Sequence, residues 1–150
     1  MEKGPRLATY GDFQAVEEIA RTAYAGYVPR IGSEPGPMLD DYRGLIEEGR
    51  VHVVEHGGVV QGILVLIPQS DAMLLDNVAV APAAQGLGLG RRMLEFAERA
   101  AIASGFRWIR LYTNEVMTEN IGLYSRIGYS ETHRAEEHGL RRVFMAKLLT

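Results

Sequence analysis

The sequence predicts an α/β fold with a mixed, mostly antiparallel central sheet flanked by helices. Three observations indicate this class. β-type runs alternate with helical periodicities along the whole of the 150 residues. Between residues 73 and 112, a strand, a glycine-rich turn and a helix lead into another strand, and this succession implies parallel pairing. Elsewhere short turns separate the β-type runs, which is typical of antiparallel hairpins.

The composition predicts a single domain. A chain of 150 residues with 47% hydrophobic and 23% charged residues can bury a sizeable core, so we expect one domain over residues 1–150. The lack of cysteine excludes disulfides, thiolate metal sites and a cysteine nucleophile. A net charge of −3 gives no support for nucleic-acid binding. No leader-like or membrane-spanning apolar run occurs, so we expect a cytoplasmic protein without a membrane partner.

The first elements follow from local signals. Residues 6–9 resemble a short strand, and Asp12 is placed to cap the next helix. The stretch from Tyr27 to Pro37, with three prolines and two glycines, is the most irregular of the chain. A short helix over Leu39 to Glu48 is then expected to end at Gly49. The helix after Asp12 shows apolar residues at helical spacing, namely Phe13, Val16, Ile19, Ala20 and Ala23.

The remaining elements are predicted in the same way. A hairpin joins Val51 to Glu55 and Val59 to Ile67 through a turn with two glycines. Met73 to Val80 supplies the next strand, which a proline ends. We expect helices over Leu89 to Ser104 and Thr118 to Arg126, and strands over Trp108 to Tyr112, Tyr129 to Ala135 and Arg141 to Leu149.

The turn before the helix at residue 89 carries Gln85-x-x-Gly88-x-Gly90, with Gly86 inside it. Glycines at this density let the backbone approach a bulky group and point several N–H groups inward. The positive end of the helix dipole faces the same place, and Arg91 adds formal charge. The turn therefore predicts a site for an anion such as a phosphate or pyrophosphate.

Three alternatives were weighed against this turn. A Walker A loop requires Gly-Lys-[Ser/Thr], but Arg91 follows Gly90. A dinucleotide fingerprint requires a glycine at residue 91 and an acidic residue after the next strand, where the chain has Tyr112-Thr113-Asn114. A glycine-rich connection without a ligand is disfavoured, because several glycines cost conformational entropy.

A second motif, Asn120-Ile-Gly-Leu-Tyr124-Ser-Arg-Ile-Gly128-Tyr129, lies on the helix near residue 120. With the glycine turn and the order of elements, it resembles the GCN5-related N-acetyltransferase (GNAT) family. One position departs from the family's pattern, because Met117 stands where many members carry an asparagine. Asn114 and Asn120 are the two candidates to supply that hydrogen bond.

The resemblance implies a GNAT fold and direct transfer of an acetyl group from acetyl-CoA to a primary amine of a small molecule or peptide. Another acyl-CoA donor, or a non-catalytic acyl-CoA sensor of the same fold, are the alternatives. No metal is implied, and a homodimer is an expectation from the resemblance only. The residues expected to bind the co-substrate are Val78, Ala79, Val80, Gln85, Gly86, Leu87, Gly88, Leu89, Gly90, Arg91, Asn114, Asn120 and Tyr124.

Two residues are candidates for proton transfer. Tyr124 resembles the family's general acid; the alternative is a core or rim tyrosine. Alternation places Asp76 on one face of its strand with Val78 and Val80, where relatives carry a base, so Asp76 is the first candidate for that role. The alternative is that Asp76 or Asn77 satisfies backbone groups at a bulge or where the strand splays.

We expect residues 24–42 and the last hairpin to bind the acceptor. Tyr24 and Tyr27 could shape a pocket, and Arg30 suits an acceptor that carries a carboxylate. A solvated connecting loop is the alternative. The adjacent Arg141 and Arg142 are interpreted as a solvated strand edge.

Overall fold

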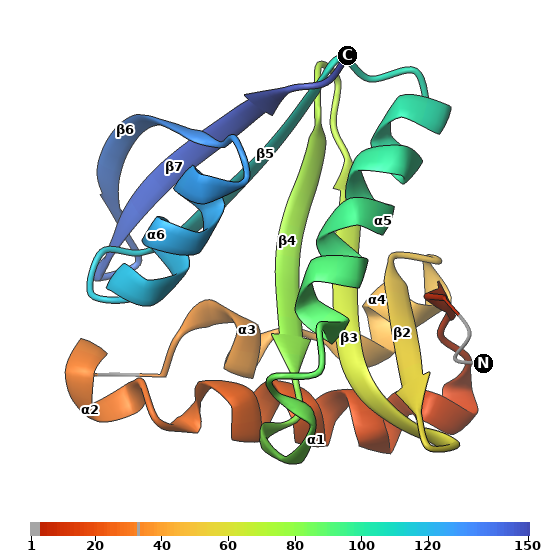
Figure 1. Cartoon of the computed structure of the whole chain (residues 1–150). Helices are drawn as coiled ribbons and strands as arrows, with labels where there is room; N and C mark the ends of the chain where they lie inside the picture. The colour runs from red at the N-terminus through yellow and green to blue at the C-terminus, as the bar shows by residue number, and fades with distance from the viewer. Residues whose placement is uncertain (1–3, 33) are drawn as a thin grey trace.

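The computed structural model describes residues 4–32 and 34–150. Within these residues seven strands form one sheet in the order β1-β2-β3-β4-β5-β7-β6 (Figure 1). β4 and β5 run parallel, and every other neighbouring pair is antiparallel, which confirms the expected mixed sheet. The strands are β1 (Arg6–Leu7), β2 (Val51–His56), β3 (Val59–Pro68), β4 (Met73–Val80), β5 (Trp108–Asn114), β6 (Ser130–Glu137) and β7 (Leu140–Leu148).

Helices cover both faces of this sheet. In the described part of the chain, none of them combines the length and hydropathy needed to cross a bilayer. The 3-10 turns are η1 (Tyr10–Asp12) and η2 (Pro82–Ala84). The α-helices are α1 (Phe13–Ala25), α2 (Val28–Ile31), α3 (Gly36–Leu39), α4 (Tyr42–Glu47), α5 (Leu89–Ala103) and α6 (Thr118–Arg126).

Two apolar cores lie on opposite faces of the sheet. α5 turns a stripe of Met93, Ala97 and Ala101 toward the sheet, and all three side chains are fully buried. This core continues under α6, where Tyr124 and Tyr129 belong to it. On the other face, α1 and α4 pack against β2 and β3 through a second core.

The sheet opens in its middle, between the two parallel strands. β4 and β5 pair over Met73–Leu75 and Ile109–Leu111; beyond this, β5 follows β7 while β4 stays with β3. Figure 1 shows the two ribbons spreading apart in a V below this pairing. A β-bulge lies at the same level, since Val65 faces Asn77 and Leu66 faces Leu75, which leaves Asp76 as the extra residue.

Two local predictions are corrected. The helix expected over Leu39 to Glu48 is interrupted, because Asp40 is extended (ψ 150°) and Asp41 caps a new helix by accepting from the Gly44 N–H. Asp12 precedes α1, but its side chain makes no cap there. The chain is already helical at Asp12, and its carboxylate turns back to the Thr9 N–H (2.8 Å) and to Arg6.

Candidate active site

A small cleft fills the V between β4 and β5. Its volume is about 50 Å³, enough for reacting groups but not for a whole substrate. β4, β5 and α6 supply most of its wall, and the loop around residue 36 and β7 close it. Its polar lining is Tyr24, Asp76, Asn77, Tyr112, Thr113, Asn114, Asn120, Tyr124 and Arg142. The structure thus brings several sequence-predicted residues together in one place.

Tyr124 reaches the cleft from the middle of α6. Its side chain is buried, and its ring packs edge-on against Tyr129, with the ring centroids 5.7 Å apart. Burial, and to a smaller extent the charge of Tyr27, raises the pKa of the Tyr124 phenol well above its ordinary value. The phenol therefore keeps its proton at neutral pH and is in the form that can donate it.

Asp76 enters the cleft from the bulge of β4. Its Oδ1 accepts a hydrogen bond from the Tyr112 hydroxyl (3.1 Å), and burial raises the pKa of its carboxyl. The bulge that was weighed as an alternative is present, yet this carboxyl bonds a side chain of β5. The carboxyl is therefore turned into the cleft, where it can act on a ligand.

Asn77 fastens the bulge to the opposite helices. Its Oδ1 accepts from the Tyr24 hydroxyl, and its Nδ2 donates to the Tyr42 hydroxyl (2.9 Å). Tyr24 also lies within hydrogen-bond distance of the Val78 carbonyl (3.2 Å). Tyr24, expected to bind the acceptor, thus lines the cleft with a hydroxyl that already holds β4 in place.

Three residues at the cleft were missed by sequence reasoning. The Asp40 carboxyl hydrogen-bonds that of Asp76, while the Arg142 guanidinium lies over the Tyr112 ring at 4.4 Å. Arg142 is 14% exposed, so its interpretation as a solvated edge is wrong. Alternation along β5 could have placed Tyr112 toward β4, but Asp40 fell inside an expected helix and gave no signal.

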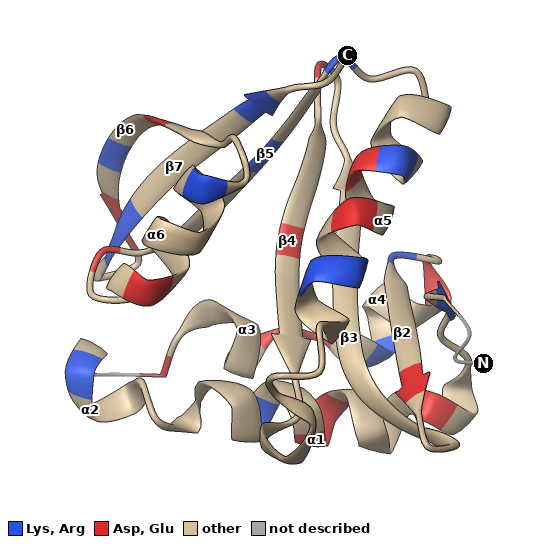
Figure 2. Ribbon diagram, viewed as in Figure 1, with Lys and Arg blue, Asp and Glu red and all other residues tan. Residues whose placement is uncertain are grey.

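The glycine turn lies at the end of β4, where α5 begins. Gly86 and Gly88 have φ of 85° and 80°, a left-handed conformation that favours glycine. Arg92 N–H bonds back to the Gly88 carbonyl (3.1 Å), whereas the N–H groups just before it belong to the first turn, where an α-helix offers no intrahelical acceptor. Arginine colours this turn in Figure 2. These donors, with open space beside Gly86 and Gly88, fit an anion.

Side chains in this region have different tasks. Gln85 Nε2 bonds the Val80 carbonyl (3.4 Å) and so holds the turn to β4. Leu89 is buried under α5, and Ala79 faces the core on the α1 side, which leaves only their backbones to meet a ligand. Leu87 is exposed, as is Arg91, which pairs with Glu95 (3.4 Å). Val78 and Val80 pack toward α5, and Asn114 Oδ1 accepts from the Val116 N–H (3.0 Å).

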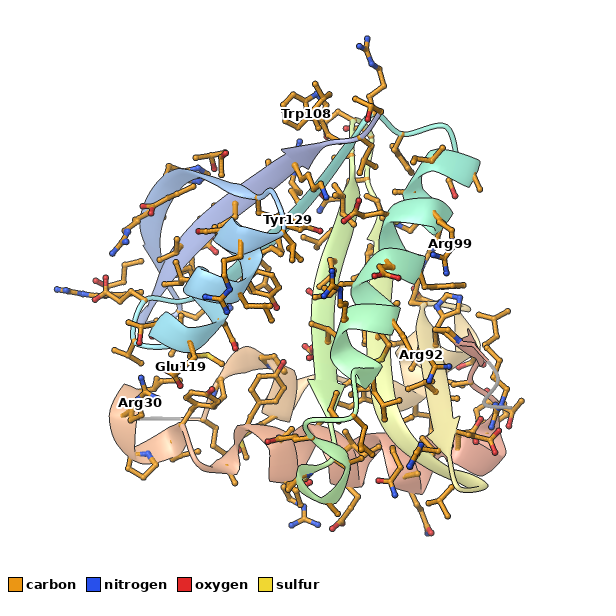
Figure 3. The ribbon with its side chains drawn as sticks, in the orientation of Figure 1. Arg30, Arg92, Arg99, Trp108, Glu119 and Tyr129 are labelled. Carbon is orange, nitrogen blue, oxygen red and sulfur yellow. The ribbon has the colours of Figure 1, made fainter. Side chains whose placement is uncertain are left out.

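Tyr27 and Arg30 lie outside the cleft lining, at a contact between α2 and α6. Arg30 forms a two-armed ion pair with Glu119 (2.9 and 3.0 Å) and bonds the Val116 carbonyl. The Tyr27 hydroxyl donates to the same carboxylate (3.2 Å). Figure 3 shows Arg30 and Glu119 pointing toward one another across this contact. Both side chains thus join the two arms of the V near the cleft.

Comparison with known proteins agrees with this architecture. The structure is similar to the ribosomal-protein-S18-alanine N-acetyltransferase of Escherichia coli (19% identity, TM-score 0.80, covering 100% of this chain and 95% of that one). It is also similar to the PaiA N-acetyltransferase of Thermoplasma acidophilum, solved with coenzyme A (16%, 0.82, 99% of both chains), and to Ard1 of Thermoplasma volcanium (17%, 0.80, 97% of both). These identities establish the fold. Residues 47–131, more than half of the chain, match the model of the acetyltransferase (GNAT) domain. The chain therefore belongs to the GNAT family of acetyltransferases.

Proposed function

We propose that this protein transfers an acetyl group from acetyl-CoA directly to a primary amine of a small molecule or peptide. The observation that carries this proposal is the cleft between β4 and β5, where a protonated phenol and a carboxyl group share the lining. A proton donor and a proton acceptor are what acyl transfer from a thioester to an ammonium group requires. The family membership supports acetyl transfer as the reaction class.

The donor would be held at the end of β4. The first-turn N–H groups of α5 and the side chain of Arg91 are suited to a pyrophosphate. The β4 backbone from Asp76 to Val80 faces the opening of the V, where it can bond the amides of a pantetheine arm. Asn114 and Asn120 lie on the same route. When bound, acetyl-CoA supplies the acetyl group as a thioester; the solved complex of the PaiA relative with coenzyme A supports this choice.

The chain's own groups account for the protons. Asp76 accepts one proton from the acceptor's ammonium, so that the nitrogen lone pair can form the new C–N bond as the C–S bond breaks. Tyr124 donates its hydroxyl proton to the departing sulfur and regains a proton from the acylated nitrogen. Asp76 then releases its proton to solvent. The sum is one amide, one free thiol and one proton, and the chain is unchanged.

An amine panel tests the proposal. Purified protein is mixed with acetyl-CoA and single amines or peptides, and free coenzyme A is measured over time. Tyr124→Phe should lower kcat by about a hundredfold or more with the best acceptor, since general acid catalysis of this kind contributes on that order. Its affinity for acetyl-CoA, measured by calorimetry, should stay close to that of the wild type.

Tyr129→Phe is the matched control. Its ring touches that of Tyr124, and its buried hydroxyl has no hydrogen-bond partner among the described residues, so kcat should be retained. Tight binding of acetyl-CoA without turnover of any amine would rule out catalysis and favour the sensor alternative. Turnover with a longer acyl-CoA but not with acetyl-CoA would transfer the proposal to that donor.

A further inference from the structure

Two carboxyl groups meet at the wall of the cleft. Asp76 comes from the bulge of β4, and the Asp40 carboxyl hydrogen-bonds it. An ionised carboxylate only accepts hydrogen bonds, so two of them bond each other only when one carries a proton. The geometry therefore describes a pair that holds one proton between two residues 36 positions apart in the chain.

The fold places Asp40 there through a fastened turn. Asp40 is the extended residue between α3 and α4, and its carbonyl accepts from the Tyr42 N–H (3.1 Å). Tyr42 is buried, and its hydroxyl bonds both the Pro37 carbonyl and the Asn77 side chain. The turn is thus tied to β4 one residue beyond Asp76, which sets the two carboxyl groups against each other.

The surroundings limit the pair to a small negative charge. The Tyr112 hydroxyl donates to Asp76, and Arg142 favours the ionised form of both carboxyl groups. Among residues 4–32 and 34–150 there is no cluster of three His, Asp or Glu side chains that could hold a metal ion instead. The titratable and charged side chains that act on the pair are Tyr24 of α1, Tyr42 of α4, Tyr112 of β5 and Arg142 of β7.

We propose that Asp40 is a positioning residue for Asp76, and that the two carboxyl groups form one proton-sharing pair that takes the proton of the acceptor's ammonium group. The inference rests on the proposed function for the identity of the acceptor, but the pair itself does not. In the transfer, the fully ionised pair gains one proton from nitrogen, holds it between the two carboxyl groups, and later releases it to solvent.

Sharing adapts the pair to work near neutral pH. Burial, and next the charge of Asp76, raise the pKa of Asp40 to about 6. This value belongs to the last proton of the pair rather than to one residue, since the two titrations are coupled. A base is most effective when its pKa lies near the working pH, and an isolated aspartate, with a pKa of about 3.9, lies well below it. Asp40 thus makes Asp76 a stronger base.

A titration of the full-length protein tests the pair without any acceptor. The side-chain carboxyl carbons of aspartate are followed by ¹³C NMR between pH 3 and 8, with coenzyme A present at saturation, and are assigned with Asp40→Asn and Asp76→Asn. A step near pH 6 should move both carbons together in the wild type, and it should vanish in either variant. Independent titration of both groups near pH 4 in the wild type would overturn the proposal, even if neither variant folds.

Asp41→Asn is the matched control. Asp41 is the exposed neighbour of Asp40 and caps α4, a task that asparagine performs equally well. This variant should keep the step near pH 6. A loss of the step in Asp41→Asn would overturn the assignment, because the turn and not the Asp40 carboxyl would then govern the titration.

The kinetic consequence is a change in the pH profile. With an amine acceptor from the panel, the acid limb of kcat/KM should move to lower pH by about one unit in Asp40→Asn, because the remaining carboxyl loses its like-charged neighbour. Asp41→Asn should leave the limb in place. A uniform loss of rate at every pH, with the limb unmoved, would reduce Asp40 to a structural residue. Failure of every amine would overturn the proposed function, while the titration would still decide whether the pair exists.

Discussion

Asp12 shows how one buried carboxylate ties the N-terminal strand to the first helix. It accepts from two guanidinium nitrogens of Arg6 (2.8 and 3.1 Å) and from the Thr9 N–H (2.8 Å). The Arg6 guanidinium, followed by the Thr9 N–H, lowers the pKa of Asp12 to about 2. Because the side chain of Asp12 is 12% exposed while that of Arg6 is 41% exposed, the stabilisation is partly screened.

The stability that Asp12 supplies should depend on pH. Its folded-state pKa is depressed, so the contribution is complete above about pH 4 and is lost as the pH falls toward 2. Asp12→Asn should cost about 1 to 2 kcal/mol in the free energy of unfolding at pH 7. In urea titrations, this deficit should shrink markedly at pH 3. An equal deficit at both pH values would contradict this account.

Asp71→Asn serves as the control for this comparison. Asp71 pairs with Arg110 at 2.7 Å, but 66% of its side chain is exposed. Exposed ion pairs contribute little, so its removal should change the free energy of unfolding by less than about 1 kcal/mol.

At the scale of elements, α5 combines a buried stripe with a first turn that ends in a glycine loop. Gly88 is its N-cap in the left-handed region, and an added Cβ would extend into open space beside the turn. Under the proposed function, that space is where the pyrophosphate would lie. A side chain there would exclude the ligand while it meets nothing in the protein.

Gly88→Val should therefore abolish measurable binding of acetyl-CoA in a calorimetric titration. Gly105→Val is matched to it, because Gly105 also has a positive φ (88°) and open space around its Cβ, but lies beyond the other end of α5. Both variants carry backbone strain of about 1 to 2 kcal/mol, and only Gly88→Val should lose the ligand. Wild-type affinity in Gly88→Val would show that the turn is not the anion site.

At the scale of the whole molecule, two cores share one sheet. The core under α5 and α6 and the core under α1 and α4 are separated by β3 and β4, whose alternate residues enter one or the other. Loss of either core would expose one face of these strands. We therefore expect the chain to unfold as one unit, as single domains of this size usually do.

Truncation in either core should displace a single unfolding transition. Ile19→Ala on α1 and Met93→Ala on α5 remove buried side chains and should each cost about 2 to 5 kcal/mol. Far-UV circular dichroism and the fluorescence of Trp108, the one tryptophan, should give coincident curves in urea. Ile102→Ala, on the exposed face of α5, should have little effect. Separate transitions in the two core variants would show that the faces unfold independently.

Local signals predicted those elements whose ends are set by nearby residues. Met73 to Val80 and Thr118 to Arg126 are strand and helix with the bounds expected, and α5 ends one residue earlier than expected. Alternation, helical spacing and terminal glycines act over a few residues, so they can be read without knowledge of the fold. The irregular stretch after Tyr27 was different, because its short helices depend on contacts with α6 and β4.

The sequence by itself determined the family, the succession of strands and helices, and the glycine turn that follows β4. Only the tertiary structure decided where β4 and β5 separate, and which groups meet in the cleft between them. Asp40, Asp76, Tyr112 and Arg142 lie on four distant segments. Their contacts follow from strand register, the bulge of β4 and burial, and these arise only when the segments pack together.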